Sequence, residues 1–401
     1  MLKHSKNRWL LPDGVQETLP LDALSVELLR REILSIYHSW GYDLVMPAMI
    51  EYLDSLLTGT AHSLDTQTFT LVDQVSGKQM GVRSDMTPQV ARIDAHLLAD
   101  DQRSNRVTRL CYCGHLLHAQ GEGITSSRTP LQIGAEIFGS ATIAADIEVV
   151  SLMIETLHKA DLGDISIDIG HVGIFRNLIV NSELDISQEN RLFEMLQRKS
   201  IPELQQYLQQ LDIPDDLAEH IYRLALLNGD ISVIEEAREL FADNDSKELH
   251  LALDHMCAVV EGVQAKFPDT RIHCDLSELR GYSYHTGLVF AAFLPGQGKE
   301  IARGGRYDDV GSVFGNARPA TGFSADLLNL YQLANNSSAT PEPGILAPNN
   351  NDPDLNAQIQ KLRTNNQRVI VDLSNGISSP VEQQCNRILV QEKSGWTVKE
   401  A

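Results

Sequence analysis

The chain lacks the features of a secreted or membrane protein. No apolar run approaches the ~18 residues of a membrane span, and the N-terminal stretch MLKHSKNRWLLPDG has no apolar core of signal-peptide length. The five cysteines are an odd number without repeated spacing, which predicts reduced thiols rather than a disulfide framework. We therefore expect a cytoplasmic protein.

Basic residues are also scarce. The chain has 33 Lys and Arg against 54 Asp and Glu, a net charge of −21. Its cations are scattered, with pairs only at Arg30–Arg31 and Arg198–Lys199. Because phosphate neutralisation by Lys and Arg supplies most of the affinity for nucleic acids, we expect no tRNA partner, unless a basic patch assembles in three dimensions.

Compact catalytic and metal motifs are missing or weak. The segment GGRYDDVG (304–311) has neither the lysine nor the spacing of a P-loop, and the chain has no nucleophile elbow and no H-E-x-x-H. RVIVDLSNGISSP (368–380) fits either a sugar-phosphate loop or an ordinary turn. CYCGH places Cys111, Cys113 and His115 on one strand face, as metal ligands or as packing. Same-face positions wrap an ion poorly, so we favour packing and expect no metal.

The periodicity predicts an α+β fold, an antiparallel sheet with flanking helices interrupted by a helical insertion at about 187–266. A domain over 1–333, a linker at 334–344 and a small α/β domain at 345–401 are expected. The larger domain has expected helices at 21–40, from Thr87, at 143–160 and at 322–333, and expected strands at 42–52 (with Pro47 inside), 106–118, 131–139, 271–276, 284–294 and 299–303, plus a hairpin over 68–83. Expected tail helices lie near 353–365 and 380–386.

Four segments combine polar side chains with glycines near expected strands: RSDMTPQ (83–89), LQIGAEIFG (131–139), LRGYSYHTG (279–287) and RGGRYDD (303–309). Together they supply carboxylates, an amide, guanidinium groups from Arg280 and Arg306, and tyrosine hydroxyls. A free amino acid needs carboxylates for its ammonium and an arginine for its carboxylate, and glycine lets backbone approach a small ligand. The segments therefore indicate an amino-acid pocket.

In this order the segments resemble histidyl-tRNA synthetase, a class II aminoacyl-tRNA synthetase, over most of residues 8–332. LPDGVQETLP is similar to that family's opening, and YDLVMPAMIEY around Pro47 to its first motif, which implies a homodimer interface there. RSDMTPQVARIDA through GAEIFG is similar to the second motif, and LRGYSYHTGLVF and RGGRYDDV to the two histidine-recognition signatures.

The resemblance implies roles for eight residues as histidine ligands. By position, Asp85, Thr87 and Gln132 would hold the α-ammonium, and Arg280 would hold the carboxylate. The imidazole would be lined by the remaining set, Glu136, Tyr284, His285 and Tyr307. The chain departs from the family pattern twice, since Asp85 is one methylene shorter than the family's glutamate and His285 replaces the second of a tyrosine pair.

The arginines that grip ATP in the synthetases are absent by the same alignment. His118 stands where the motif-two arginine is expected, and Leu328–Asn329 stand where the third motif has Glu-Arg. Since preorganised cations supply the main stabilisation of charge at a reacting phosphate, we expect no adenylation chemistry.

This combination is similar to the regulatory subunits of ATP phosphoribosyltransferase, as are DIGHVGIFRNL (168–178) and LPDGV. The resemblance implies a non-catalytic chain without cofactor that activates a short-form catalytic subunit in a hetero-octamer, in the first step of histidine biosynthesis, and transmits feedback inhibition by histidine. Two alternatives stay open: a divergent active histidyl-tRNA synthetase, or an activating scaffold with a vestigial pocket.

Overall fold

The computed structural model describes residues 10–57, 66–98, 106–121, 127–281, 284–314, 317–334, 342–374 and 377–401. By compactness the chain divides into two units, with Val26–Asn336 in the larger and Ser337–Ala401 in the smaller. None of the helices in these ranges is both long enough and apolar enough to cross a bilayer.

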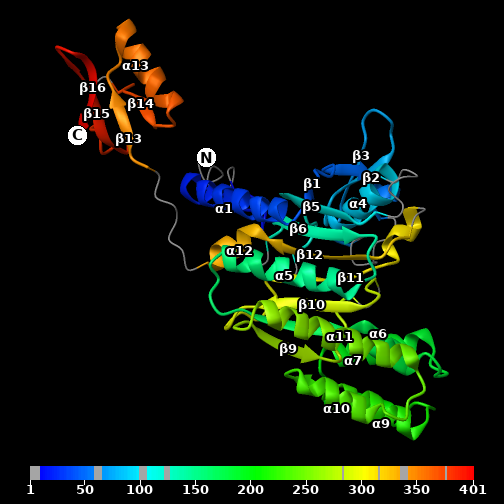
Figure 1. Ribbon diagram of the computed structural model, residues 1–401. Helices are drawn as coiled ribbons and strands as arrows, with labels where there is room; N and C mark the ends of the chain where they lie inside the picture. The colour runs from blue at the N-terminus through cyan, green and yellow to red at the C-terminus, as the bar shows by residue number, and fades with distance from the viewer. Residues whose placement is uncertain are drawn as a thin grey trace, which may run out of the picture. The chain divides into compact units, whose positions relative to one another are not determined.

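A mixed but mainly antiparallel sheet forms the larger unit (Figure 1). Six strands run antiparallel side by side, in the order β5, β6, β12, β11, β10, β7. Parallel pairs β1–β5 and β7–β9 and a short β8 complete the nine strands found in the described residues. The bounds are β1 Asp43–Leu44, β5 Thr108–His115, β6 Leu131–Phe138, β7 Ser166–His171, β8 Asn228–Gly229, β9 Arg271–Asp275, β10 Leu288–Phe293, β11 Ala302–Arg306 and β12 Ala320–Asp326.

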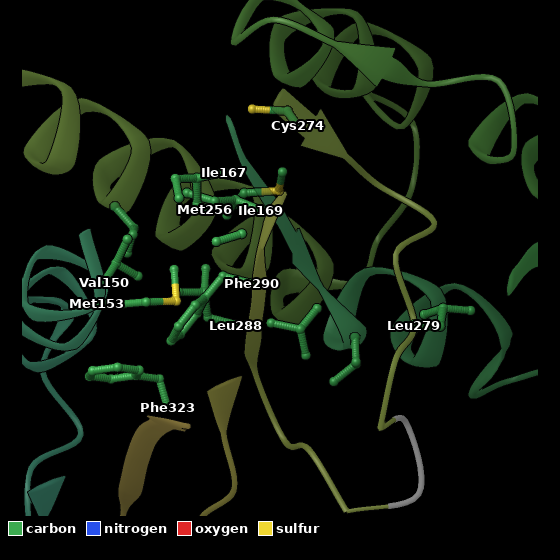
Figure 2. Close-up of a cluster of buried hydrophobic side chains, with 14 of the residues drawn as sticks. Val150, Met153, Ile167, Ile169, Met256, Cys274, Leu279, Leu288, Phe290 and Phe323 are labelled. Atoms are coloured by element: carbon green, nitrogen blue, oxygen red, sulfur yellow. The ribbon is translucent and has the colours of Figure 1, made fainter. Parts of the chain in front are cut away.

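Two helices cover one face of this sheet, α5 (Ile143–Lys159) and α11 (Lys247–Lys266). Their apolar side chains interlock with those of the strands, as Figure 2 shows for Val150, Met153, Met256, Phe290 and Phe323, all at most 2% exposed. Each such side chain contributes roughly 1.5–3 kcal/mol when fully buried. The apolar side chains of the strands therefore pack against the helices. Since side chains alternate along a strand, the polar side chains of the same strands point to the opposite face of the sheet.

The expected helical insertion is confirmed as a run of helices that ends with α11. Asp185 and Gln188 form a reciprocal capping box at its start, and Ser246 caps α11. His171 caps the helix that precedes the insertion by accepting from the Gly173 N–H. The bounds are α6 Val172–Ile179, α7 Ile186–Gln197, α8 Ile201–Leu208, α9 Asp215–Leu224 and α10 Ser232–Leu240. The two-residue β8 within it was not predicted.

The expected hairpin over 68–83 is confirmed as β3 (Phe69–Val72) and β4 (Gln79–Val82), which pair antiparallel. The continuous strand expected around Pro47 is wrong: β1 lies before Pro47, and β2 (Ile50–Tyr52) lies after it in a different sheet, with β4. Proline offers no N–H to a ladder, so the chain changes sheets there. The bounds of nearby helices are α1 Pro20–Ser39, α2 Leu53–Leu57, α4 Thr87–Arg92 and the π-helix η1 Ile93–Leu97.

Three other expectations in the larger unit are corrected. The helix expected over 322–333 begins only at Leu327, as α12 (Leu327–Leu333), because β12 runs to Asp326. Thr87 does not cap α4; Met86 holds the cap position without a side-chain hydrogen bond. The strand expected from 284 begins at Leu288, and a 3₁₀-helix, η2, covers Val310–Phe314.

The smaller unit is a sheet of order β14-β13-β15-β16 with one helix, as far as its residues are described. Leu355 and Ile359 of the helix pack with Ile345, Val369 and Leu389. The helix expected near 380–386 is wrong, because turns fill 380–384 and a strand starts at Cys385. The bounds are β13 Gly344–Ala347, α13 Pro353–Thr364, β14 Val369–Val371, β15 Cys385–Glu392 and β16 Gly395–Glu400. The domain limits at 334–344 and 345–401 stay predictions.

A buried ion pair links the helical face to the sheet. Asp146 of α5 accepts from Arg306 of β11, with Oδ2 2.9 Å from Nη2, and from His255 of α11 at 2.8 Å. Burial alone would raise the pKa of Asp146, but its bond to His255 and the charge of Arg306 lower it below its ordinary value. These contacts join α5, α11 and β11 at one point.

We predict that Asp146→Ala destabilises the chain by ~3–5 kcal/mol, because it leaves the buried Arg306 uncompensated. Denaturant unfolding measures the change. Asp164→Ala is the matched control, since Asp164 and its partner Arg271 are 89% and 70% exposed and such pairs contribute ~0–1 kcal/mol. Equal losses in the two variants would refute a structural role for this buried pair.

Candidate functional site

The face of the large sheet opposite α5 has a floor of glycines beneath a buried carboxylate. Glu136 on β6 pairs with Gly322 on β12, and Gly322 pairs with Gly305 on β11, so all three face the same side. A Cβ at Gly322 would lie 1.4 Å from Glu136 Oε2. A Cβ at Gly134 would lie 2.5 Å from the hydroxyl of Tyr112. Only glycine fits at these positions, which is why strand interiors here tolerate it.

Glu136 is the centre of this face and is 1% exposed. Tyr112 donates to Oε1 at 2.9 Å, and Tyr307 donates to Oε2 at 2.5 Å. Burial raises the pKa of Glu136 to about 8, against the lowering effect of the two tyrosine hydroxyls. Burial and the same carboxylate raise the pKa of both tyrosines well above 10, so both are donors.

A second polar group lies beside Glu136, at the start of α4. Gln132 Nε2 donates to Asp85 Oδ1 at 2.8 Å, and Gln132 Oε1 accepts from the Met86 N–H at 2.9 Å. Asp85 also accepts from the backbone N–H of Thr87 at 2.9 Å. The Thr87 hydroxyl lies 3.1 Å from that of Tyr112. One hydrogen-bond network therefore joins Asp85, Thr87, Gln132, Glu136 and Tyr307, five of the eight expected ligands.

Tyr284 and His285 come from the loop before β10, of which 282–283 lie outside the described residues. Their ring centroids are 4.2 Å apart. His285 is 6% exposed, its Nδ1 lies 3.0 Å from the Arg280 carbonyl oxygen, and burial lowers its pKa to about 4. A neutral ring that donates to a carbonyl supports the shape of the loop. Tyr284 keeps 39% of its surface exposed, so it lies at the rim.

Arg280 lies on Phe293, with its guanidinium carbon 5.0 Å from the ring centroid. Glu278 accepts from the Arg280 backbone N–H at 2.8 Å and lies 3.4 Å from Nη2. Among the described residues, the buried Nη1 has no hydrogen-bond partner. Arg280 therefore keeps donor capacity, but its charge is already offset by Glu278.

Arg306, the other guanidinium of the four segments, faces the helices and pairs with Asp146. His118, at the position expected for an ATP-binding arginine, has Nε2 2.9 Å from the Ser84 carbonyl oxygen. The nearby Arg83 donates to the carbonyls of Pro47 and His115, and Arg128 donates to those of His118 and Asp13. These arginines tie loops together.

The CYCGH motif lies on β5. Cys111 is buried, Cys113 is half-buried and His115 is exposed, and burial raises the pKa of both thiols to about 12. In the described ranges no group of three or more His, Cys, Asp or Glu side chains is arranged to hold a metal.

Sequence reasoning missed Tyr112, which joins the two halves of the network. It lies between the cysteines and faces the opposite side of β5, toward Glu136. Period-two alternation with Gly114 was the available signal. Cys111 and Cys113 lie on the other face of β5, away from Glu136.

Comparison with known proteins assigns the chain to a family. A family model described as Histidyl-tRNA synthetase matches residues 14–330, and one described as ATP phosphoribosyltransferase subunit HisZ C-terminal domain matches residues 342–399. Proteins named ATP phosphoribosyltransferase regulatory subunit are 49% identical in Thioalkalivibrio sulfidiphilus and 46% identical in Pseudomonas putida, each over 98% of both chains. The chain belongs to the ATP phosphoribosyltransferase regulatory subunit family.

Solved structures agree with this family and confirm the class II synthetase-like fold. An ATP phosphoribosyltransferase regulatory subunit/histidyl-tRNA synthetase from Bacillus halodurans superposes with a TM-score of 0.81 at 27% identity, over 93% of this chain and 95% of that one. Histidyl-tRNA synthetase from Nostoc has a TM-score of 0.77 at 19% identity, over 98% of this chain and 94% of that one, which shows the fold alone. The roles of the eight expected histidine ligands in this chain stay predictions.

The raised pKa of Glu136 predicts a pH dependence of stability. The unfolded carboxyl loses its proton near pH 4.5 and the folded one only near about 8, so the free energy of unfolding falls as pH rises through this window. Glu136→Gln, which has no proton to lose, is expected to flatten this fall by a few kcal/mol. Thermal unfolding of both proteins at pH 5, 6.5 and 8.5 measures it; parallel curves would contradict the assignment.

Proposed function

We propose that this non-catalytic regulatory subunit activates a short-form ATP phosphoribosyltransferase catalytic subunit and lowers its activity when histidine fills the pocket on the glycine floor. The observation that carries the proposal is the network of Asp85, Gln132 and Glu136. Asp85 and Gln132 offer acceptors for an ammonium group, and the buried Glu136 offers an acceptor for a ring N–H. Both carboxylates lie on the face of the sheet opposite the helices.

The proposed ligand roles follow from the hydrogen bonds. Asp85 and Gln132 would hold the α-ammonium, with Thr87 beside them, because Gln132 Nε2 donates to Asp85 Oδ1 at 2.8 Å and so places the Asp85 carboxylate next to the Gln132 amide oxygen, and both groups are acceptors. Glu136 would accept the imidazole N–H, oriented by Tyr112 and Tyr307. Tyr284 would cover the ring from the rim, and His285 and Arg280 would complete the loop.

The absence of synthetase chemistry in this proposal rests on two positions. Adenylation develops charge on the α-phosphate of ATP, which needs a cation there. His118 stands at that position and binds a carbonyl, and Leu328–Asn329 stand where a second arginine is expected. Two described arginines of the neighbouring segments, Arg83 and Arg128, donate to backbone carbonyls.

We further propose a homodimer through the segment around Pro47, as part of a hetero-octamer with catalytic subunits in the cytoplasm. Exposed apolar side chains gather in this segment: Leu44, Met46, Met49, Ile50 and Tyr52 are 45–82% exposed. Arg83 fixes the segment by donating to the Pro47 carbonyl at 2.7 Å. A fixed apolar surface is characteristic of a subunit interface. All five cysteines are free thiols, as in a reducing compartment.

The test is phosphoribosyl-ATP formation by a short-form catalytic subunit, with and without this chain and with increasing histidine. We expect stimulation by the chain and inhibition by histidine, with a coupling free energy of ~1–3 kcal/mol. No stimulation and no complex would refute the proposal.

Further arms of that assay separate the alternatives. Histidine- and ATP-dependent pyrophosphate exchange by the chain alone would indicate a divergent synthetase. Stimulation without any histidine binding, by the chain or by the complex, would indicate a scaffold with a vestigial pocket.

The proposed interface predicts that Met46→Glu weakens the homodimer by more than about tenfold, because it buries an unpaired charge. Sedimentation velocity over a dilution series measures the dissociation constant. Val75→Glu is the control, since Val75 is 96% exposed at the hairpin turn, outside the segment. A dimer that tolerates Met46→Glu as well as Val75→Glu would place the interface elsewhere.

A further inference from the structure

We propose that His285 accepts a hydrogen bond from the ring of the bound amino acid, and that His285 and Glu136 together select an imidazolium, the doubly protonated ring of histidine. This assignment rests on the histidine-binding function proposed above and adds the protonation state of the ligand. The synthetase pattern does not supply that state, because it has a tyrosine where this chain has His285. The position of the His285 ring and its tautomer carry the assignment.

The ring of His285 lies on the glycine floor next to Glu136. A Cβ at Gly305 would lie 2.8 Å from His285 Nε2, and a Cβ at Gly322 would lie 1.4 Å from Glu136 Oε2. Gly305 and Gly322 are register partners on β11 and β12. Because the Cα atoms of such partners are only about 4.5–5.5 Å apart, the two side chains reach neighbouring positions on the floor. Glu136 comes from β6, and His285 comes from the loop before β10.

The loop fixes the orientation of this ring. Gly281, at φ +68°, lies against its other edge, where an added Cβ would be 2.5 Å from Nδ1. The Tyr284 ring lies beside it, with the centroids 4.2 Å apart, and Arg176 of α6 donates to the His285 carbonyl at 3.2 Å. Nδ1 therefore faces the loop, and Nε2 faces the floor.

The tautomer of His285 makes Nε2 an acceptor. Nδ1 lies 3.0 Å from the Arg280 carbonyl oxygen, which can only accept, so Nδ1 carries a hydrogen. Burial lowers the pKa of His285 to about 4, against the bond to Arg280 and with a further contribution from the charge of Arg303. The ring is therefore neutral at pH 7, and Nε2 has a lone pair. Among the described residues no hydrogen bond reaches Nε2.

A ligand ring on this floor meets two acceptors, Glu136 and His285 Nε2. A neutral imidazole has one N–H and one lone pair, so its lone pair would face that of Nε2. An imidazolium has two N–H groups and satisfies both acceptors. Burial raises the pKa of Glu136 to about 8, so its carboxyl holds a proton at pH 7 in the free protein. On binding, the carboxyl O–H breaks and a ring N–H forms, and the carboxylate and imidazolium are left as a charge-assisted pair.

Proton counting by calorimetry, on the full-length chain in buffers of different ionisation enthalpy, tests the assignment. The free histidine ring has a pKa of about 6.5, so at pH 7 the proton comes from Glu136 and we expect roughly zero protons exchanged with the buffer. At pH 5.5 the free ring is already protonated, and about one proton should be released. Affinity should thus rise with pH up to about 6.5 and stay level to about 8. Release of about one proton at pH 7 would mean a neutral bound ring and would overturn the assignment.

Two variants of His285 sharpen the test. His285→Tyr supplies a hydroxyl that can donate to an unprotonated ring nitrogen, so about one proton should be released at pH 7. His285→Phe removes the acceptor, and histidine should bind about 10- to 100-fold more weakly, the loss typical of a charge-assisted hydrogen bond. His38→Phe, at an exposed position in the last turn of α1, is the control and should leave affinity and proton number unchanged.

The outcomes separate this assignment from the function on which it rests. A proton number in His285→Tyr equal to that of the wild type would show that position 285 does not read the ring, and would overturn the assignment. Histidine bound with release of about one proton at pH 7 would remove the assignment and leave the sensing function intact. A wild-type chain and complex that bind no histidine would refute the sensing function itself, and the assignment with it.

Discussion

The burial of one carboxylate sets the arrangement of the pocket face. Glu136 is 1% exposed, and a carboxyl group without water must find its hydrogen bonds within the protein. Tyr112 and Tyr307 provide them from β5 and from the end of β11, so three strands must be held in register. Gly322 and Gly134 leave the volume that the carboxylate and the Tyr112 hydroxyl occupy. Substitution of either glycine would move the strands that align the tyrosines.

Much of the fold could be predicted because its periodic segments are long. The antiparallel sheet, the hairpin at 69–82 and the helical insertion follow from alternation or helical spacing carried through many residues. The start of β12 could not be predicted in the same way. In TGFSADLLNL the small residues before Leu327 fit either period, and they form the end of β12, which carries Gly322 beneath Glu136. At 380–386 too few residues were available to separate a helix from turns.

The sequence predicts which residues of the site share one face of the sheet, but it does not predict which of them pair with one another. Gln132 and Glu136 alternate correctly on a strand, and Asp85 precedes a helix start, so sequence places them near one another. Arg306 pairs with Asp146, which lies far from it in the chain on α5, whereas Arg280 pairs with Glu278 only two residues away. Arg280 and Arg306 therefore looked alike in sequence, and Tyr112 was hidden between two cysteines.

The same register gives neighbouring residues opposite tasks. Tyr307 donates to Glu136 on the pocket face, while Arg306 pairs with Asp146 on the helical face, where His255 of α11 also binds. Asp308 then accepts from Arg306 and from the Ala320 N–H, which fixes the turn after β11 to the start of β12. Tyr307 is therefore linked to the helical insertion through three residues, by its peptide bond to Arg306 and by the hydrogen bonds from Arg306 to Asp146 and from His255 to Asp146. Coupling along it requires a second stable arrangement of these contacts, because a close-packed sheet does not deform gradually. The buried Asp146 pair is the part of that route whose rearrangement costs most.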